Sequence, residues 1–204
     1  MQNLSLFVFA TLLLAITPGQ DFIYVMIRSV SQGAKAGIIA ISGLMVGVMF
    51  HTIAAATGVA AILMTSSYAF LVIKIIGAMY LIYLGIQAIK QTGKLEIKKT
   101  KDIISKRQLF REGVLSSLFN PKLALFFMAF LPQFVADKSN AFIHMLTLGL
   151  LFALLSLPIL ISVAVLSEKF GNIIMTNKKI SERIGKITGV VLIGLGIRLA
   201  LTEK

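Results

Sequence analysis

The chain has 204 residues, 57% of them hydrophobic, with a mean hydropathy of +0.92 and a net charge of +12. This apolar share exceeds the roughly 45–50% of soluble domains, and the apolar runs recur from end to end, so the composition excludes an ordinary soluble fold. Cysteine is absent, which excludes disulfides, iron–sulfur clusters and a transmembrane thiol–disulfide electron carrier.

Six apolar runs are long enough to cross a bilayer, which takes about 20 residues each. They cover residues 4–27, 37–64, 68–88, 113–135, 141–166 and 184–201. The first run carries no positive charge at its start and no small-residue cleavage site, so we interpret it as a retained helix and not as a secretory signal. The sequence predicts an all-α integral membrane protein that forms a single membrane domain over residues 1–204. Its halves, 1–90 and 113–204, are joined by a polar linker at 91–112.

The basic residues predict the orientation of these crossings. Fifteen of the 20 Lys and Arg residues fall in the connections after the first, third and fifth runs, eight of them from Lys90 to Arg111. Short loops rich in Lys and Arg remain in the cytoplasm. We therefore expect the linker on the cytoplasmic side of the membrane and both termini on the outer side. The basic linker is interpreted as a topology determinant beside anionic lipid headgroups, in preference to a nucleic-acid site.

A helix-breaking motif lies within the first crossing. Thr17-Pro18-Gly19-Gln20-Asp21 places a Pro-Gly pair beside the only charge between residues 4 and 27. Thr is a good N-cap, Pro is tolerated at the first helical position, and Gln20 completes a capping-box pattern. The pattern predicts that a helix restarts at Thr17 inside the membrane, with its N–H groups facing a cavity.

A second break is predicted in the fourth crossing, where Asn120-Pro121-Lys122 repeats the pairing of a cap residue with proline. Two three-helix halves that each open with a broken helix suggest an inverted repeat, with broken helices 1 and 4 meeting at the substrate. The alternative is that each proline only bends its helix.

Three side chains near the breaks are candidates for chemistry. Asp21 is interpreted as the partner of a substrate ammonium group or as a proton carrier, against a simple helix-start acid. Lys122 either extends toward the cytoplasmic surface, neutralises Asp21 or holds a substrate carboxylate. His51 titrates near neutral pH and suits proton coupling, but an isolated buried histidine is commonly a packing residue.

The two motifs resemble those of the lysine exporter / threonine–homoserine efflux (LysE/RhtB) family. The resemblance includes Thr-Pro-Gly-x-Asp, the following Ser31-Gln32-Gly33-x-x-Ala36-Gly37, the Asn120-Pro121-Lys122 motif and Phe130-Leu131-Pro132-Gln133-Phe134. It covers essentially the whole chain and departs at Gln20, where the family has a second proline. It implies an exporter of amino acids or their derivatives that lies in the bacterial inner membrane and is driven by an ion gradient. It also implies a translocation path lined by both motifs: Thr17, Pro18, Gly19, Asp21, Asn120, Pro121 and Lys122.

The leading hypothesis is thus a proton-coupled exporter and not an enzyme. A single clear intramembrane acid favours a neutral zwitterion of the threonine or homoserine type over a dication, which would need a second buried partner. The alternatives are a cation or metal exporter of the same fold and a non-transporting scaffold subunit. We expect no cofactor and no metal site. The small-residue faces at Gly43, Gly47 and Gly58, and at Gly185 and Gly189, suit packing within the chain or a homodimer. The substrate and the coupling ion stay open.

Overall fold

The computed structural model describes residues 4–59, 61–62, 66–90, 103–135, 138–176 and 178–201, and every regular element within them is helical. In chain order they are α1 (Leu4–Ile16), α2 (Gln20–Gln32), α3 (Ala34–Ala54) with the π-helical turn η1 (Ala55–Val59), α5 (Ser67–Lys90), α6 (Lys106–Leu118), α7 (Pro121–Leu125) with the π-helical η2 (Phe126–Phe130) and the 3-10 turn η3 (Leu131–Phe134), η4 (Lys138–Asn140), α8 (Ala141–Thr176) and α9 (Lys178–Leu201).

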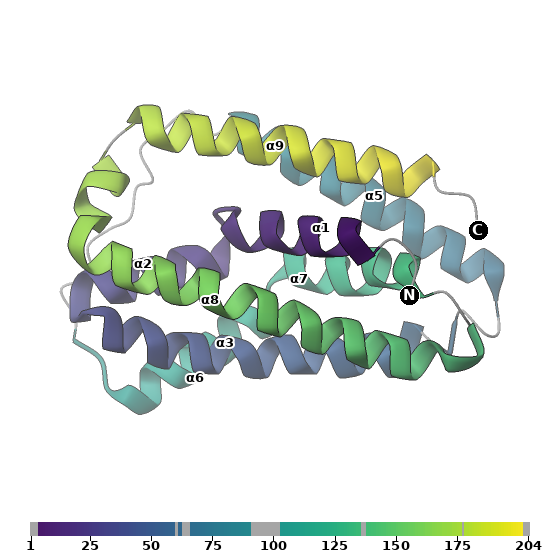
Figure 1. Cartoon of the computed structure of the whole chain (residues 1–204), viewed down its shortest axis with the longest axis horizontal. Helices are drawn as coiled ribbons and strands as arrows, with labels where there is room; N and C mark the ends of the chain where they lie inside the picture. The colour runs from purple at the N-terminus through teal and green to yellow at the C-terminus, as the bar shows by residue number, and fades with distance from the viewer. Residues whose placement is uncertain are drawn as a thin grey trace.

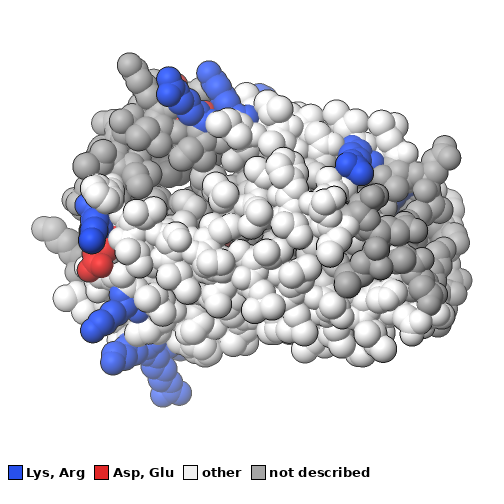
Figure 2. Space-filling view, viewed as in Figure 1, with Lys and Arg blue, Asp and Glu red and all other residues white. Residues whose placement is uncertain are grey.

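The helices run along the long axis of an elongated bundle (Figure 1). The start of α1 and the end of α9 lie at one end, and α9 packs along α5. The junction of α2 with α3 and the start of α6 lie at the opposite end. Lys and Arg side chains gather at that second end on the face shown in Figure 2, and the middle of this face carries almost no charge. Residues 94–101, which hold four of the linker lysines, lie outside the described residues.

The predicted spans are borne out in part. Among the described residues, three helices are long and apolar enough to cross a membrane, Ala34–Gly58, Leu71–Lys90 and Ala141–Phe170. The number rises to five if the bent pairs α1/α2 and α6/α7 each count as one span. The sixth predicted span, 184–201, lies in α9, which is not among these. The six crossings and the inverted relation of the two halves are therefore not confirmed.

Both predicted breaks are present, but only one has the predicted capping. The axes bend by 47° between α1 and α2 and by 45° at the second break. Asn120 caps α7, because its side chain accepts a hydrogen bond of 3.0 Å from the Lys122 N–H and Pro121 follows as the first helical residue. The prediction that Thr17 caps the second half-helix, with Gln20 completing a capping box, is wrong. The Thr17 hydroxyl donates back to the Leu13 carbonyl, and α2 begins only at Gln20, after Gly19.

The fourth predicted span also begins earlier than expected. Helix α6 starts at Lys106, where the Ser105 side chain caps it by accepting from the Gln108 N–H, and not at Gly113. Residues 106–112, which we assigned to the linker, are therefore helical. The first turn of α6 is polar because it lies at the basic end of the bundle, where a helix needs no apolar surface.

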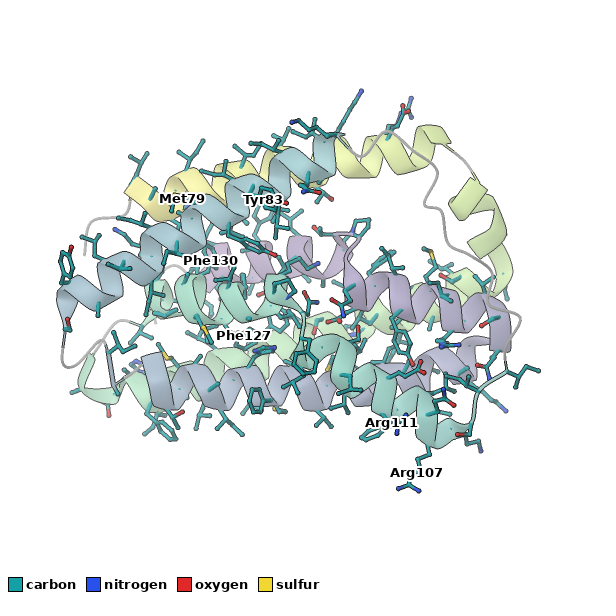
Figure 3. All side chains as sticks on the ribbon, turned by 180° about the vertical axis from the view of Figure 1, so that it is seen from behind. Met79, Tyr83, Arg107, Arg111, Phe127 and Phe130 are labelled. Carbon is teal, nitrogen blue, oxygen red and sulfur yellow. The ribbon has the colours of Figure 1, made fainter. Side chains whose placement is uncertain are left out.

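Phenylalanines form the core behind the second break. Phe127 and Phe130 point into the bundle, whereas Met79 and Tyr83 of α5 project outward and Arg107 and Arg111 extend from α6 at the basic end (Figure 3). Ring centroids 5.0–6.5 Å apart join a cluster from α1, η2, η3 and α8: Phe7, Phe126, Phe127, Phe130, Phe134 and Phe152. Such contacts stabilise beyond the area they bury, so this cluster fixes η2 and η3, which continue from α7, against α1 and α8.

Glycines bring two pairs of helices into backbone contact. A methyl group added at Gly43 of α3 or at Gly113 of α6 would meet a backbone carbonyl oxygen of the other helix. The same holds for Gly85 of α5 and Gly189 of α9. These contacts therefore serve packing within one chain, as small residues commonly do in membranes. Gly58 is not part of such a contact, because a Cβ atom there would meet no atom of the described residues within 4 Å. No homodimer is shown.

Candidate functional site

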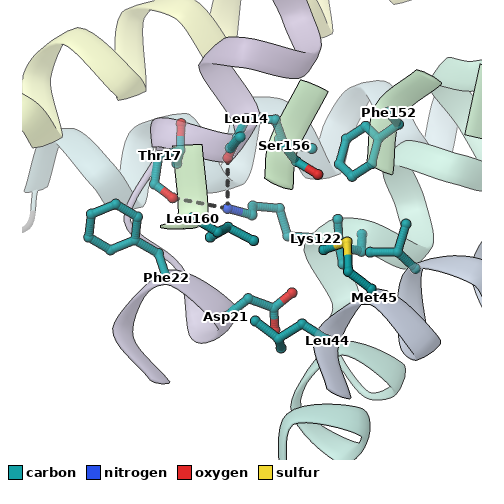
Figure 4. Close-up of a pocket in the computed structure, with 13 residues that line it drawn as sticks. Leu14, Thr17, Asp21, Phe22, Leu44, Met45, Lys122, Phe152, Ser156 and Leu160 are labelled. Atoms are coloured by element: carbon teal, nitrogen blue, oxygen red, sulfur yellow. Dashed lines mark hydrogen bonds between the residues drawn. The ribbon is translucent and has the colours of Figure 1, made fainter. Parts of the chain in front are cut away.

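A small cavity lies where the first break meets α7. It is lined by Thr17, Asp21 and Lys122 and by apolar side chains of α3 and α8, and Ser156 adds a hydroxyl from α8 (Figure 4). Its volume is about 30 Å³, measured as the space open to the centre of a water molecule. A cavity of that size has room for one or two water molecules. A larger solute therefore requires the surrounding helices to move apart.

The Lys122 side chain binds the end of α1. Its Nζ donates hydrogen bonds to the carbonyl oxygens of Thr17 at 3.1 Å and of Leu14 at 3.3 Å (Figure 4). Leu14 belongs to the last turn of α1 and Thr17 follows directly after it. Carbonyls at a helix C-terminus carry partial negative charge and lack helical N–H partners, and Pro18 has no N–H to offer them. Lys122 thus satisfies the break in α1 and does not extend along the membrane toward solvent. One of its three N–H groups is not used by these bonds.

Gly19 provides the space for this lysine. A Cβ atom at Gly19 would lie 2.8 Å from Nζ and 3.2 Å from Cε of Lys122. The backbone itself does not require glycine, because its φ of −160° and ψ of −175° are extended values that any residue adopts. The glycine of the first motif is therefore explained by the close approach of the lysine of the second.

Asp21 lies in the first turn of α2, where the helix dipole favours a negative charge. Its Oδ1 accepts a hydrogen bond of 3.0 Å from the hydroxyl of Ser116 on α6. Asp21 and Lys122 line the same cavity, but no ion pair joins these two described residues. The cavity therefore presents a carboxylate and an ammonium group that do not neutralise each other by direct contact.

His51 and Asn120 lie beside the cavity and not on its wall. His51 is buried, and its Nε2 lies 3.0 Å from the Ser117 carbonyl oxygen. A carbonyl only accepts, so Nε2 carries the hydrogen and satisfies a carbonyl at the end of α6. The Asn120 amide nitrogen is buried and makes no hydrogen bond of good geometry within the described part of the chain, but the Asn120 side chain lies beside the Asp21 carboxylate and interacts with it.

The structure thus brings three of the predicted site residues onto one cavity, namely Thr17, Asp21 and Lys122. Pro18, Gly19, Asn120 and Pro121 shape the two breaks next to it. Sequence reasoning missed Ser116 and Ser156. Ser116 lies four residues before Asn120, and Ser156 lies two residues before Pro158 in a long apolar run. A search for hydroxyls within five residues before a proline would have included both.

A row of polar contacts leads from Asp21 toward the basic end. We call it the α2–α6 polar seam: Asp21, Tyr24, Arg28 and Gln32 of α2 with Ile104, Leu109, Glu112 and Ser116 in and before α6. After the Asp21–Ser116 bond, the Tyr24 hydroxyl donates to the Leu109 carbonyl at 2.9 Å. Arg28 and Glu112 form an ion pair of 2.8 Å. The Gln32 amide then donates to the Ile104 carbonyl at 2.9 Å and its oxygen accepts from the Ile104 N–H.

Among the described residues, no three His, Cys, Asp or Glu side chains lie close enough to hold a metal ion. The fold and the cavity define a class: a multi-pass helical membrane protein in which two broken helices enclose a small charged cavity. The chain belongs to the LysE type translocator family, whose model matches residues 12–203. It is therefore a membrane transporter by family.

Named relatives cover nearly the whole chain. An uncharacterized membrane protein of Vibrio cholerae is 30% identical over 93% of this chain and 92% of that protein. The uncharacterized membrane protein YrhP of Bacillus subtilis is 29% identical over 99% and 100%. The homoserine/homoserine lactone efflux protein of Salmonella typhimurium is 28% identical over 92% and 91%. No solved structure matches the chain.

Proposed function

We propose that this protein is a secondary active exporter of small neutral amino acids or their derivatives, of the threonine or homoserine type, and that it works by proton antiport. The observation that carries the proposal is the small cavity that Asp21 and Lys122 both line without forming an ion pair with each other. A zwitterion has the complementary charges, with its ammonium group for Asp21 and its carboxylate for the unused N–H of Lys122. The efflux activity in the name of the Salmonella typhimurium relative supports the same substrate class.

The proposed cycle rests on the cost of carrying an unpaired charge. Substrate enters from the cytoplasm and its ammonium group pairs with ionised Asp21. After release outside, Asp21 would have to return as a buried carboxylate beside two neutral groups, the Ser116 hydroxyl and the Asn120 amide, with the Lys122 ammonium group too far away to form an ion pair. Burying such a charge is far more costly than burying the protonated acid. A proton taken up from outside therefore accompanies the return step, and each turnover exchanges substrate for a proton.

The proposed setting is the bacterial inner membrane with both termini outside. The gathering of Lys and Arg at the end of the bundle where α6 begins supports this orientation. Because the cavity holds only one or two waters, the described conformation is an occluded one in this proposal. The seam between α2 and α6 is then the contact that separates the cavity from the basic side.

The test uses purified protein in liposomes with an imposed pH gradient. Wild-type protein is expected to move radiolabelled L-homoserine or L-threonine against a concentration gradient and to move protons in response. Asp21→Asn keeps the size and hydrogen bonding of the side chain but removes the titratable charge, so it should insert normally and show neither movement. Glu168→Gln, at an exposed acid on α8, is the matched control and should behave as wild type.

Two outcomes contradict the proposal. If wild-type protein moves no amino acid under these conditions, the substrate class is wrong. If Asp21→Asn exports at near wild-type rates over a range of external pH, Asp21 is only a helix-start residue. The proton carrier then has to be sought elsewhere, and His51 is the next residue to test.

A further inference from the structure

The middle of the α2–α6 polar seam contains an incompletely used arginine. Arg28 gives one hydrogen bond, from Nη2 to the Glu112 carboxylate at 2.8 Å, and its guanidinium lies over the Tyr24 ring with 5.5 Å to the ring centre. Its Nε and Nη1 atoms are buried and have no hydrogen-bond partner within the described residues. Arginine offers five N–H donors in a fixed fork. Buried donors without acceptors are costly, so this arrangement is one that an added acceptor would improve.

Glu112, unlike Arg28, has hydrogen-bond partners beyond the ion pair. Besides Arg28, its carboxylate accepts from the Gln108 amide at 3.0 Å and from the Tyr24 hydroxyl at 3.3 Å. If Arg28 turned away, Glu112 would keep the Gln108 amide as a donor, together with a share of the single Tyr24 hydroxyl hydrogen, which also bonds the nearer Leu109 carbonyl. The ion pair is also only partly buried, with 12% of the Arg28 side chain and 29% of the Glu112 side chain exposed. The pair can therefore exchange partners without leaving a stranded carboxylate.

We propose that Arg28 and Glu112 form a second binding site for a zwitterionic amino acid, between the basic end of the bundle and the cavity at Asp21. The guanidinium takes the carboxylate of the solute in its fork, and Glu112 takes the ammonium group. The solute thereby replaces each partner of the ion pair by a group of the same charge. In the empty state the two residues satisfy each other and hold α2 against α6.

The position of the pair supports a role in passage and not only in packing. Arg28 lies about two turns along α2 from Asp21, and both residues contact α6 on the same face of α2. A solute that parts the seam at Arg28 is therefore on the line that leads to Asp21. This inference rests on the proposed function, because it concerns the same substrate on its way to the cavity.

The experiment compares two ligands that differ only in the carboxylate. L-Threonine is a zwitterion, and L-threoninamide keeps the ammonium group but has a neutral amide instead. Each is measured as an inhibitor of L-homoserine transport by wild-type protein, Arg28→Gln, Arg28→Lys and the control Lys35→Gln. Lys35 is an exposed cation at the start of α3 and tests the loss of one positive charge without touching the seam.

Arg28→Gln is expected to raise the inhibition constant of L-threonine about 10–100-fold, the range expected for lost hydrogen bonds to a charged group. The constant of L-threoninamide should change less than about threefold. Arg28→Lys should give an intermediate loss, again confined to L-threonine, because an ammonium group keeps the charge but not the fork. Glu112→Gln should weaken both ligands, and Lys35→Gln neither.

Binding in the absence of transport gives an independent measurement. Asp21→Asn disables the proposed site at the cavity, so any L-threonine binding that calorimetry still detects in this variant is assigned to Arg28 and Glu112. This weak binding should disappear in the double variant Asp21→Asn/Arg28→Gln. It should persist in the double variant Asp21→Asn/Lys35→Gln. If both Arg28 variants raised the inhibition constants of L-threonine and L-threoninamide by the same factor, the ion pair would serve only to hold α2 against α6. That result would overturn this inference alone. If Arg28→Gln does not fold, the Arg28→Lys comparison decides. Failure of wild-type protein to move any amino acid would overturn the proposed function and this inference together.

Discussion

The contact between Gly19 and Lys122 gives the sharpest test of how the two motifs depend on each other. Gly19→Ala should destabilise this protein although its backbone angles suit alanine. In an extended conformation that alanine can adopt, loss of glycine usually stabilises by about 0.4–1 kcal/mol, because the unfolded chain loses freedom. Here the new Cβ would lie 2.8 Å from Lys122 Nζ. Lys122 has to withdraw by about 0.6 Å to reach the 3.4 Å at which ordinary van der Waals contact begins.

The cost follows from the two bonds that hold the ammonium group. At 3.1 and 3.3 Å they are already long, so a withdrawal of this size takes both beyond hydrogen-bonding distance. Hydrogen bonds to a charged group contribute about 1.5–3 kcal/mol each. After the favourable backbone effect and partial rearrangement of a flexible side chain, we expect a net loss of about 1–3 kcal/mol. For a chain of this size that corresponds to a lower melting temperature by about 2–4 °C per kcal/mol.

The assay is a double-mutant cycle on purified protein in detergent, with melting followed by tryptophan-independent methods such as circular dichroism, since the chain has no tryptophan. Lys122→Met removes the ammonium group and keeps most of the stem. In that background Gly19→Ala should become neutral or stabilising, because the terminal methyl group has no carbonyl bonds to lose. Equal destabilisation by Gly19→Ala in both backgrounds would refute the idea that Gly19 is there for Lys122.

Three further predictions concern other parts of the molecule. His51→Gln should lower the melting temperature, because it disturbs the hydrogen bond to the Ser117 carbonyl, but it should leave substrate-driven proton movement intact. Loss of proton coupling without a change in melting temperature would instead assign His51 to the proton path. Ser156→Ala should reduce the preference for L-homoserine over the isosteric L-norvaline about 2–10-fold, the effect of one neutral hydrogen bond. Ser162→Ala, on the exposed face of the same helix, should leave this preference unchanged. Equal effects of the two substitutions would count against a role of Ser156 in selectivity. Reporters active only outside the cytoplasm should work at the C-terminus and fail within 91–112, and the reverse pattern would overturn the topology.

The positions of the two breaks were predictable because proline and polar residues interrupt apolar runs at few places in this sequence. Asn120 followed by Pro121 specified a helix start, and the structure has it. Thr17 followed by Pro18 looked equivalent, but the Thr17 hydroxyl bonds the carbonyl of Leu13, one turn back. A local pattern could not decide between these two uses of a hydroxyl, since both are available to threonine near a helix terminus.

The α2–α6 polar seam was beyond prediction for a different reason. Arg28 and Glu112 are 84 positions apart, and each looked like an ordinary charge at the polar end of an apolar run. Their pairing depends on how α2 lies against α6 after the break has redirected it. The same holds for Lys122, whose partners are carbonyls of another half of the chain. Sequence periodicity identifies which segments are helices but not which helix faces meet.

The glycine contacts have a mechanical consequence. Where the backbones of α3 and α6 touch through Gly43 and Gly113, separation by even an ångström would open a gap that no side chain fills, and α5 and α9 are joined in the same way through Gly85 and Gly189. Each of these two helix pairs is therefore expected to move as one rigid unit. The half-helices α1 and α2 meet their neighbours through side chains, which can slide and exchange partners. Widening of the cavity should consequently appear as movement of α1 and α2 relative to the α3–α6 and α5–α9 pairs, while the geometry within each pair stays the same.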